Sequence, residues 1–300
     1  MAIIEVVDLG KRYGPKVAVD EVSFTVEEGE IFGILGPNGA GKTTTVECVE
    51  GMRVPDRGTI RVDGLDPRRD RDALRQVLGV QLQESQLPDR IKVREALDLY
   101  SSFYPDPADW RELMGRLGLE EQRNAEFGKL SGGQKQRLSV ALALVGKPRI
   151  AVLDELTTGL DPQARRDTWD LIEGVRDSGV TVLLVTHFME EAERLCDRLA
   201  VIDAGRVVAI DTPAGLVSRV DSTQRVRFRP STPMDLALFR DLPEVSEARE
   251  HGGRIHLTGH GNLLHAVTSV LARNQVVAAD LRIDQASLDD AFVELTKREK

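Results

Sequence analysis

The stretch IFGILGPNGAGKTTT, residues 31–45, decides the fold of this chain. Its apolar part, 31–35, has the length of a buried parallel strand, and a helix is predicted from Lys42 to a stop at Gly51. The glycines between strand and helix let the backbone curl, so that successive N–H groups converge on one anion beside the positive end of the helix. The sequence therefore predicts a loop that binds phosphate.

The polar side chains of this loop follow the P-loop pattern, and each has an expected role. Lys42 would reach the β- and γ-phosphates of a nucleotide, Thr43 would ligate Mg²⁺, and Thr44 would hydrogen-bond the α-phosphate. The alternative, a glycine-rich turn with a chance lysine, does not account for the strand and helix on either side. The predicted nucleotide-binding residues of the loop are Gly36, Pro37, Asn38, Gly39, Ala40, Gly41, Lys42, Thr43 and Thr44.

Composition limits the classes of protein to consider. A length of 300 residues predicts about two domains, and the formal charge of −9 argues against nucleic-acid binding and against adhesion to an anionic membrane. No apolar run approaches the roughly 18–20 residues of a membrane span, and we expect no leader for secretion. Cys48 and Cys196 have no partner at metal or redox spacing. We therefore expect a cytosolic protein whose membrane contacts are contacts with another protein.

Three β-rich segments flank the loop, and we expect them to form strands that wrap the core sheet from one side. Tyr13 lies in the turn after the first of them. An aromatic ring at such a turn either packs in the core, which is the commoner use, or presents its face to a ligand. The three segments are residues 3–9, 17–26 and 58–63.

The pattern changes to amphipathic helices after Gln83, which predicts a helical insertion at about 84–147. The insertion contains LSGGQ at 130–134, where Ser131 would cap a helix over 134–145. Gly132 and Gly133 would expose backbone N–H groups to a second phosphate at the start of this helix. Taken alone, a serine cap followed by two glycines more often just starts a helix.

Acidic residues follow the apolar run 150–153, which we interpret as a buried strand. This strand delivers Asp154 and Glu155 at its carboxyl end, where open α/β sheets bind their ligands. Since neighbouring residues of a strand point to opposite faces, one carboxylate would hold Mg²⁺ while the other deprotonates an attacking water. The alternative is an acidic strand end that faces solvent. A second apolar run, 180–185, delivers His187 in the same way, which favours a functional histidine.

Together these motifs resemble the nucleotide-binding subunits of ABC transporters over residues 3 to about 218. The resemblance implies ATP and Mg²⁺ as cofactors. It also implies an α/β P-loop NTPase fold with a RecA-like core, an antiparallel β subdomain and a helical subdomain, in a domain of residues 1–219. It rests on GPNGAGKTT (36–44), Gln83, LSGGQ (130–134), VLDE (152–155), GLD (159–161) and His187.

The resemblance assigns roles that the residues alone leave open. Tyr13 would stack on adenine, Gln83 would contact Mg²⁺ and the attacking water, and His187 would hold the γ-phosphate. The chain has one P-loop and one copy of LSGGQ, which is the signature motif of this family. The resemblance therefore implies an ATP-dependent head-to-tail homodimer. Leu156 departs from the pattern, because most members have proline there. Ser131 and Gly133 would reach the nucleotide of the other subunit, and Asp161 would lie in the loop that links the two sites. The catalytic set is Glu155, His187, Gln83 and Lys42, the metal set is Thr43, Gln83 and Asp154, and the further nucleotide-binding residues are Ser131, Gly132, Gly133, Gln134 and Asp161.

Residues 220–300 are predicted to form an accessory α+β domain. Strand, helix, strand, strand, helix and strand follow one another, which is the ferredoxin-like order. The helices are expected at 233–240 and 262–273, with a final helix over 287–298. Arginines at 225, 227 and 229 alternate along the first strand and would share one face, as a solvated edge or as a surface for an acidic partner. The segment ASLDDAFVELT, 286–296, resembles the close of drug-export and ABC-2-type subunits.

The resemblance implies an ATPase that powers export of a drug or another hydrophobic or amphipathic cargo. The chain would lie in the cytoplasm, on the inner face of the membrane, bound to a separate multi-span permease, with no membrane span and no nucleic acid of its own. One alternative is a soluble ABC ATPase acting on ribosomes or DNA, but those members carry two nucleotide domains or a long coiled coil. The other is a non-transport regulator, against which intact Lys42, Glu155 and His187 argue.

Overall fold

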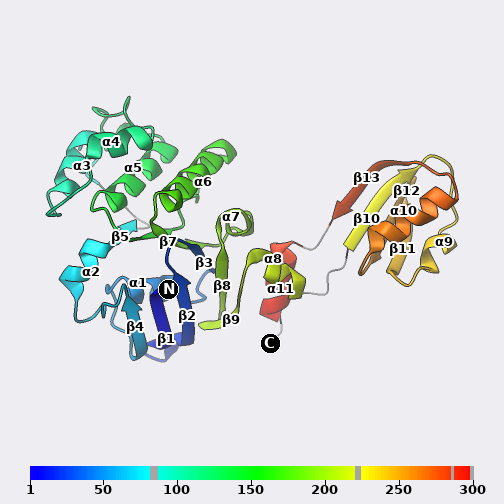
Figure 1. The fold of residues 1–300 in the computed structure, drawn as a ribbon, viewed down its shortest axis with the longest axis horizontal. Helices are drawn as coiled ribbons and strands as arrows, with labels where there is room; N and C mark the ends of the chain where they lie inside the picture. The colour runs from blue at the N-terminus through cyan, green and yellow to red at the C-terminus, as the bar shows by residue number, and fades with distance from the viewer. Residues whose placement is uncertain (82–86, 220–223, 285–286, 298–300) are drawn as a thin grey trace. The chain divides into compact units, whose positions relative to one another are not determined.

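The computed structural model describes residues 1–81, 87–219, 224–284 and 287–297. Contacts between Cα atoms divide the chain into two compact units, Met1–Pro213 and Ala214–Lys300 (Figure 1). The first unit holds the phosphate loop, LSGGQ, the acidic pair, GLD and His187, and the second holds the segment 286–296. Within the described residues, no helix combines the length and apolarity that crossing a bilayer requires.

The first unit is built on a six-stranded sheet in the order β5-β6-β7-β3-β8-β9. The first five strands pair in parallel and only β9 is antiparallel. Every residue of β3, β6 and β7 is buried, as expected for central strands with both faces covered. The strands are β3 (Ile31–Leu35), β5 (Leu78–Gln81), β6 (Ile150–Asp154), β7 (Thr181–Thr186), β8 (Arg198–Asp203) and β9 (Arg206–Asp211).

This parallel pairing positions the functional segments. Leu35, the last residue of β3, pairs with Thr186 at the end of β7, and Asp154 at the end of β6 pairs with Val185. The phosphate loop, the acidic pair and His187 therefore leave the sheet at one edge, from three adjacent strands.

A second, antiparallel sheet packs against the first in the order β2-β1-β4. Its inward side chains share one apolar core with those of the large sheet. Phe24 of β2 stacks on Phe32 of β3 with ring centroids 5.4 Å apart and the planes inclined by 11°. The strands are β1 (Ala2–Tyr13), β2 (Lys16–Glu27) and β4 (Arg57–Val62), in agreement with the three predicted segments.

The helices of the first unit fall into two groups. One group covers the large sheet, and the other has an apolar core of its own that includes Leu97, Leu113 and Leu138. The helices near the sheet are α1 (Lys42–Val49), α2 (Arg71–Val77), α6 (Pro162–Asp177) and α7 (Met189–Leu195) in chain order, and α8 (Pro213–Arg219) belongs to the second unit from Ala214 onward. The second group comprises α3 (Val93–Ser101), α4 (Trp110–Arg116) and α5 (Gly132–Leu144), so the amphipathic helices predicted after Gln83 are present.

The second unit contains a four-stranded antiparallel sheet in the order β11-β12-β10-β13, which confirms the predicted ferredoxin-like arrangement. Val226 and Phe228 of β10 are buried. On the other face, Arg225 and Arg229 are exposed and Arg227 is part-buried. The elements are β10 (Gln224–Pro230), α9 (Ala237–Arg240), β11 (Val245–His251), β12 (Arg254–Gly259), α10 (Leu263–Arg273), β13 (Ala278–Asp284) and α11 (Leu288–Lys297).

Helix α9 is shorter than the helix predicted over 233–240. Residues 233–236 are not helical, and the side chain of Asp235 accepts a hydrogen bond from the backbone N–H of Ala237 at 2.9 Å. An aspartate that bonds the backbone two residues on favours a turn over a helix, which accounts for the late start.

The stacked pair between the two sheets gives a stability prediction. Phe32 is fully buried, so Phe32→Ala should lower the free energy of unfolding by about 3–5 kcal/mol, because the cavity adds to the lost burial. Phe103→Ala is the control, because that ring is 63% exposed and its loss should change stability by only about 0.5 kcal/mol. Urea denaturation followed by circular dichroism measures both, and equal losses would contradict the central role of Phe32.

Candidate functional site

The phosphate loop is held in shape by its glycines and by one lysine. Gly39 and Gly41 have φ values of 82° and 103°, in the left-handed region that favours glycine. At Gly36 a Cβ atom would collide with the backbone carbonyl of Ile202 in β8. The ammonium group of Lys42 donates to the carbonyl oxygens of Gly36 at 2.7 Å and Pro37 at 3.1 Å. These contacts keep the loop curled around the first turn of α1.

Burial shifts the pKa values of Lys42 and of Asp154. The Lys42 side chain is only 5% exposed, and this desolvation lowers its pKa, while the nearby carboxylates of Glu155 and Asp154 oppose the effect. Asp154 is also buried, and desolvation together with the charge of Glu155 raises its pKa to about 6. Its Oδ1 atom makes no hydrogen bond with the described residues. Gln81 at the end of β5 accepts a hydrogen bond from the Asp154 backbone at 3.0 Å.

Glu155 does not continue strand β6, although the sequence argument placed both carboxylates on one strand. Its φ is 48°, a left-handed conformation that costs free energy for a residue with a Cβ atom. The chain turns after Asp154, so the alternation of side chains along a strand does not apply to Glu155. Leu156, which follows, is fully buried.

His187 contacts Glu155 directly. Its Nδ1 atom lies 3.1 Å from Oε1 of Glu155, so an N–H at this position donates to the carboxylate. His187 is part-buried and its ring lies beside that of Phe188, with centroids 4.1 Å apart. The histidine that ends β7 and the glutamate that follows β6 thus form one hydrogen-bonded pair at the edge of the sheet.

A hollow of about 400 Å³ opens beside the phosphate loop, and we call it the loop hollow. Tyr13 lines it and is 40% exposed, which makes the core interpretation of this residue wrong. Lys11 and Arg53 each place a cation 5.7 Å from the centre of the Tyr13 ring. The loop hollow is lined by Tyr13, Lys16, Ala18, Asn38, Gly39, Gly41, Lys42, Thr43, Thr44 and Glu155.

A separate hollow of about 390 Å³ lies at the start of α5, and we call it the signature hollow. Ser131 caps α5: its hydroxyl accepts from the Gln134 N–H at 3.3 Å, and the Gln134 side chain accepts from the Ser131 N–H at 2.9 Å. Asp161 caps α6 and accepts from the N–H groups of Gln163 and Ala164, both at 3.0 Å. These backbone bonds, led by that of Ala164, lower the pKa of Asp161. The two hollows share no lining residue.

Comparison with known proteins agrees with this geometry. Residues 19–158 match the family described as ABC transporter. The Nod factor export ATP-binding protein I of Burkholderia orbicola (strain AU 1054) is 47% identical over 308 residues, covering 100% of this chain and 98% of that protein. The chain belongs to the ATP-binding subunits of ABC transporters. It is therefore an ATPase, and we refer to it below as the ABC ATPase.

Two solved structures resemble the ABC ATPase in fold. An ATP-binding subunit of an ABC transporter is 28% identical with a TM-score of 0.66, covering 72% of this chain and 92% of that one. The dimeric structure of MJ0796, a bacterial ABC transporter cassette, is 25% identical with a TM-score of 0.62, covering 70% of this chain and 98% of that one. Both cover about the length of the first unit alone.

The structure places most of the predicted site residues in two groups. The loop residues, Tyr13 and Glu155 meet at the loop hollow, and Ser131 to Gln134 meet Asp161 at the signature hollow. Gln83 lies outside the described residues. Sequence reasoning missed Lys16 and Ala18, which the hairpin between β1 and β2 brings to the loop hollow. The sequence signal that could have identified Lys16 was its position three residues after Tyr13, on the same hairpin.

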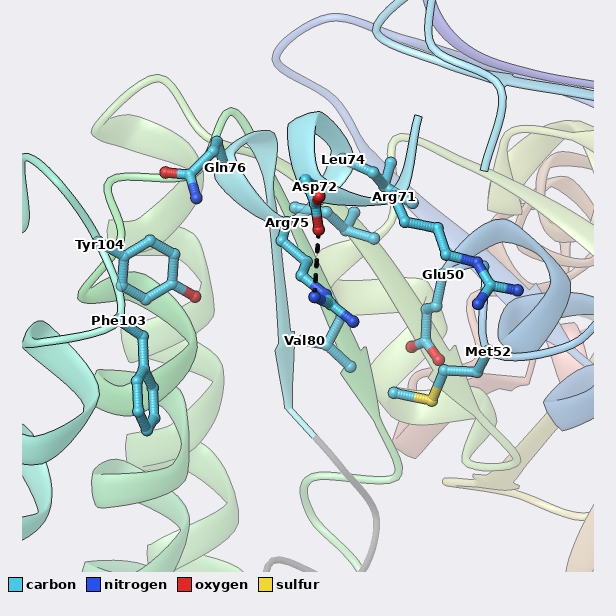
Figure 2. A pocket seen from close by; sticks show the side chains of 12 residues that line it. Glu50, Met52, Arg71, Asp72, Leu74, Arg75, Gln76, Val80, Phe103 and Tyr104 are labelled. Atoms are coloured by element: carbon cyan, nitrogen blue, oxygen red, sulfur yellow. Dashed lines mark hydrogen bonds and ion pairs between the residues drawn. The ribbon is translucent and has the colours of Figure 1, made fainter. Parts of the chain in front are cut away.

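A larger cavity, of about 850 Å³, lies beyond the carboxyl end of α1, and we call it the groove. Figure 2 shows Phe103 and Tyr104 on one side of the groove and Glu50 and Met52 on the other. Helix α2 lies between the two sides, where Asp72 and Arg75 form an ion pair at 3.4 Å. Sequence reasoning did not single out Glu50.

Glu50 has a strongly perturbed carboxyl group. Burial, reinforced by the charges of Asp154 and Glu47, raises the pKa of Glu50 to about 8 from 4.5. The folded ABC ATPase thus holds this proton more tightly than the unfolded chain does at pH values between these two limits. The free energy of unfolding therefore falls as the pH rises across that interval.

Glu50→Gln should remove this pH dependence, because the amide keeps the shape of the side chain and does not titrate. Between about pH 6 and about pH 8.5 the parent should lose roughly 1–3 kcal/mol more stability than Glu50→Gln. Unfolding midpoints measured without nucleotide at both pH values check this. Glu121→Gln, at an exposed position, is the control and should follow the parent. Identical pH profiles for the parent and Glu50→Gln would show that Glu50 is hydrated when folded.

Proposed function

We propose that the ABC ATPase is the energy-coupling subunit of an exporter. It would work in the cytoplasm, on the inner face of the membrane, through a separate multi-span permease. The Burkholderia orbicola relative, which matches the whole length of this chain, is named for export, and this supports the proposed direction of transport. The C-terminal segment ASLDDAFVELT supports a drug or another hydrophobic or amphipathic molecule as the cargo. The observation that carries the energy-coupling part of the proposal is the hollow in which the phosphate loop, Tyr13 and Glu155 meet.

In this proposal Glu155 is the general base for the water that attacks the γ-phosphate. A base needs a fixed direction and a charged state, and the left-handed backbone together with the 3.1 Å contact to His187 supplies the direction. Lys42, held at the floor of the loop, would exchange its two carbonyl partners for phosphate oxygens. His187 and Gln83 would complete the contacts to the γ-phosphate and the water. Tyr13 would stack on adenine at the outer end of the hollow.

The residues at the loop fit a magnesium ion. Mg²⁺ prefers oxygen ligands, and the fit rests on the buried Oδ1 of Asp154, which has no hydrogen-bond partner among the described residues. The Thr43 hydroxyl is exposed at the first turn of α1, next to Lys42. Thr43, Asp154 and Gln83 would hold the ion, which when bound neutralises phosphate charge. A cation here would also lower the raised pKa of Asp154.

We also propose that two copies associate head to tail, so that the signature of one copy closes the loop hollow of the other. The separation of the two hollows supports this, since neither contains a complete set of phosphate contacts. Gly132 and Gly133 add support. A Cβ atom at either position would meet its neighbours at an ordinary 3.4–3.5 Å, and neither has a positive φ. Packing within the chain therefore does not demand glycine, whereas close approach of a phosphate would.

Replacing the base tests the catalytic assignment. Glu155→Gln keeps the size of the side chain and removes its basicity, so ATP turnover should fall by about 10²-fold or more while ATP binding persists. The variant should accumulate as an ATP-bound dimer, which size-exclusion chromatography with ATP and Mg²⁺ would detect. Glu190→Gln, at an exposed position in α7, is the control and should hydrolyse ATP like the parent. Parental turnover by Glu155→Gln would mean that another group is the base.

The same variant tests the exporter. Tagged Glu155→Gln protein, loaded with ATP and Mg²⁺, would be recovered from detergent-solubilised membranes of its source, and the proteins retained would be identified by mass spectrometry. We expect a stoichiometric multi-span protein. Ribosomal proteins, DNA-repair factors or no partner would contradict the exporter and favour the soluble alternatives.

Mixing two inactive variants tests the head-to-tail arrangement. Lys42→Ala disables the phosphate loop and Ser131→Arg blocks the signature, so each homodimer should lose at least about 10-fold of its activity. A mixed dimer contains one intact site, made of the loop of one chain and the signature of the other. Adding the two variants together should therefore restore measurable ATP hydrolysis. Activity no greater than the sum of the separate variants would contradict the proposed dimer.

A further inference from the structure

Glu191 of α7 is a buried acidic residue that the proposed chemistry does not use. Its side chain is 0% exposed, and it lies one helical turn after His187 in the sequence. Helix α7 packs against α6 and against β7, the strand that ends in Thr186 (Figure 1). A fully buried glutamate is rare unless it is paired, because a carboxylate loses its hydration on burial. The groups that face this carboxyl therefore indicate what it does.

Polar groups from three segments face the Glu191 carboxyl. The indole N–H of Trp169 in α6 donates to its Oε1 atom at 3.1 Å. Burial raises the pKa of Glu191. The hydroxyls of Thr186 and Thr157, the indole N–H and the charge of Arg165 oppose this rise, since each favours the ionised carboxylate. The carboxyl therefore lies between α6, the end of β7 and the turn after β6.

The second oxygen of this carboxyl has room for a further bond. Oε2 of Glu191 and the hydroxyl of Thr157 are both buried, and neither has a hydrogen-bond partner within the described ranges of the chain. The Thr186 hydroxyl accepts from the N–H of Phe188 at 3.0 Å, which leaves its own proton to donate. A small movement of the turn toward α7 would therefore let both hydroxyls donate to one carboxylate.

Both threonines adjoin a residue of the proposed chemistry. Thr157 follows Glu155 by two positions in the same turn, and Thr186 directly precedes His187. Oε1 of Glu155 and Nδ1 of His187 lie 3.1 Å apart, so their contact depends on how these two segments are placed. The left-handed backbone at Glu155 persists only if its surroundings hold it. Glu191 faces both segments from behind.

We infer that Glu191 is a positioning residue, whose carboxylate holds the Thr157 and Thr186 hydroxyls and so sets how Glu155 meets His187 during hydrolysis. This inference rests on the proposed role of Glu155 as the base. Glu191 would act only through the two threonines. A base must be held within about 0.5 Å of its productive position, and buried hydrogen bonds behind the site supply that precision.

The alternative is that Glu191 only joins α7 to α6 through its bond to Trp169. The two interpretations predict different effects when the charge is removed. A residue that only stabilises the fold would lower the unfolding midpoint and leave the rate constant of the folded enzyme unchanged. A positioning residue would lower the rate constant, whereas loss of its buried charge would cost little stability.

The test measures kcat, KM for ATP and the unfolding midpoint of the full chain. Glu191→Gln keeps the shape of the side chain and replaces one carboxylate oxygen by an amide N–H group, which does not accept from a hydroxyl. Thr157→Val removes the hydroxyl of the turn, and a double variant combines the two changes. Glu190→Gln, at an exposed position in the same helix, is the control, and Glu155→Gln is measured in parallel.

Glu191→Gln and Thr157→Val should each lower kcat at least about 5-fold, with KM for ATP within about 2-fold and the unfolding midpoint within about 3 °C of the parent. Since both changes break the same contact, the double variant should lose no more than the larger single loss. Glu190→Gln should match the parent in all three measurements.

The outcomes that overturn the inference can be told apart. Parental kcat for Glu191→Gln beside an inactive Glu155→Gln would reject the inference alone, whereas parental kcat for both would remove the proposed base as well. Losses that multiply in the double variant would reject the action through Thr157. A lowered midpoint with parental kcat would make Glu191 purely structural. If Glu191→Gln does not fold, Thr157→Val decides, and its parental kcat would reject the inference.

Discussion

The parallel pairing of β3 with β7, and of β7 with β6, is the constraint on which the rest of the site depends. All three strands are buried along their whole length, so their register cannot shift without exposing apolar side chains or burying polar ones. Parallel strands end at the same edge, and the chain must leave that edge in turns. A loop of glycines, an acidic pair and a histidine become neighbours because they occupy those turns. The residues expected to bind and hydrolyse the nucleotide therefore lie together at the edge where these strands end.

The elements that follow simple periodicities could be predicted from the sequence. Apolar runs of four to six residues became the buried strands, and the serine and aspartate before α5 and α6 became their caps. Local geometry that depends on neighbours could not. The left-handed turn at Glu155 is imposed by the surrounding fold. The sequence argument placed Glu155 on the strand and explained its role by the alternation of side chains, which the turn makes inapplicable. The groove was equally invisible, because α1, α2, β5 and the end of α3 meet there only in three dimensions.

Burial changes the pKa values of two charged residues at the phosphate loop of the first unit. Lys42 and Asp154 are both desolvated, and their pKa values move toward one another, one down and one up. Each retains a partial partner: Lys42 donates to loop carbonyls, and the Asp154 carboxylate lies in the field of Lys42. Burying such groups costs free energy, because the charged forms lose their hydration. Charged groups of this kind cluster at functional sites, where a charged ligand can pair with them.

Helix α1 begins at Lys42 in the phosphate loop and ends at Val49, directly before Glu50 in the groove. Its eight residues span about 12 Å at the usual rise per residue. Helix α1 is continuous over two turns and packs against β1, β2 and β4. A single continuous helix therefore joins the loop where phosphate is expected to the wall of the groove, so a shift of either end along the helix axis would also move the other end.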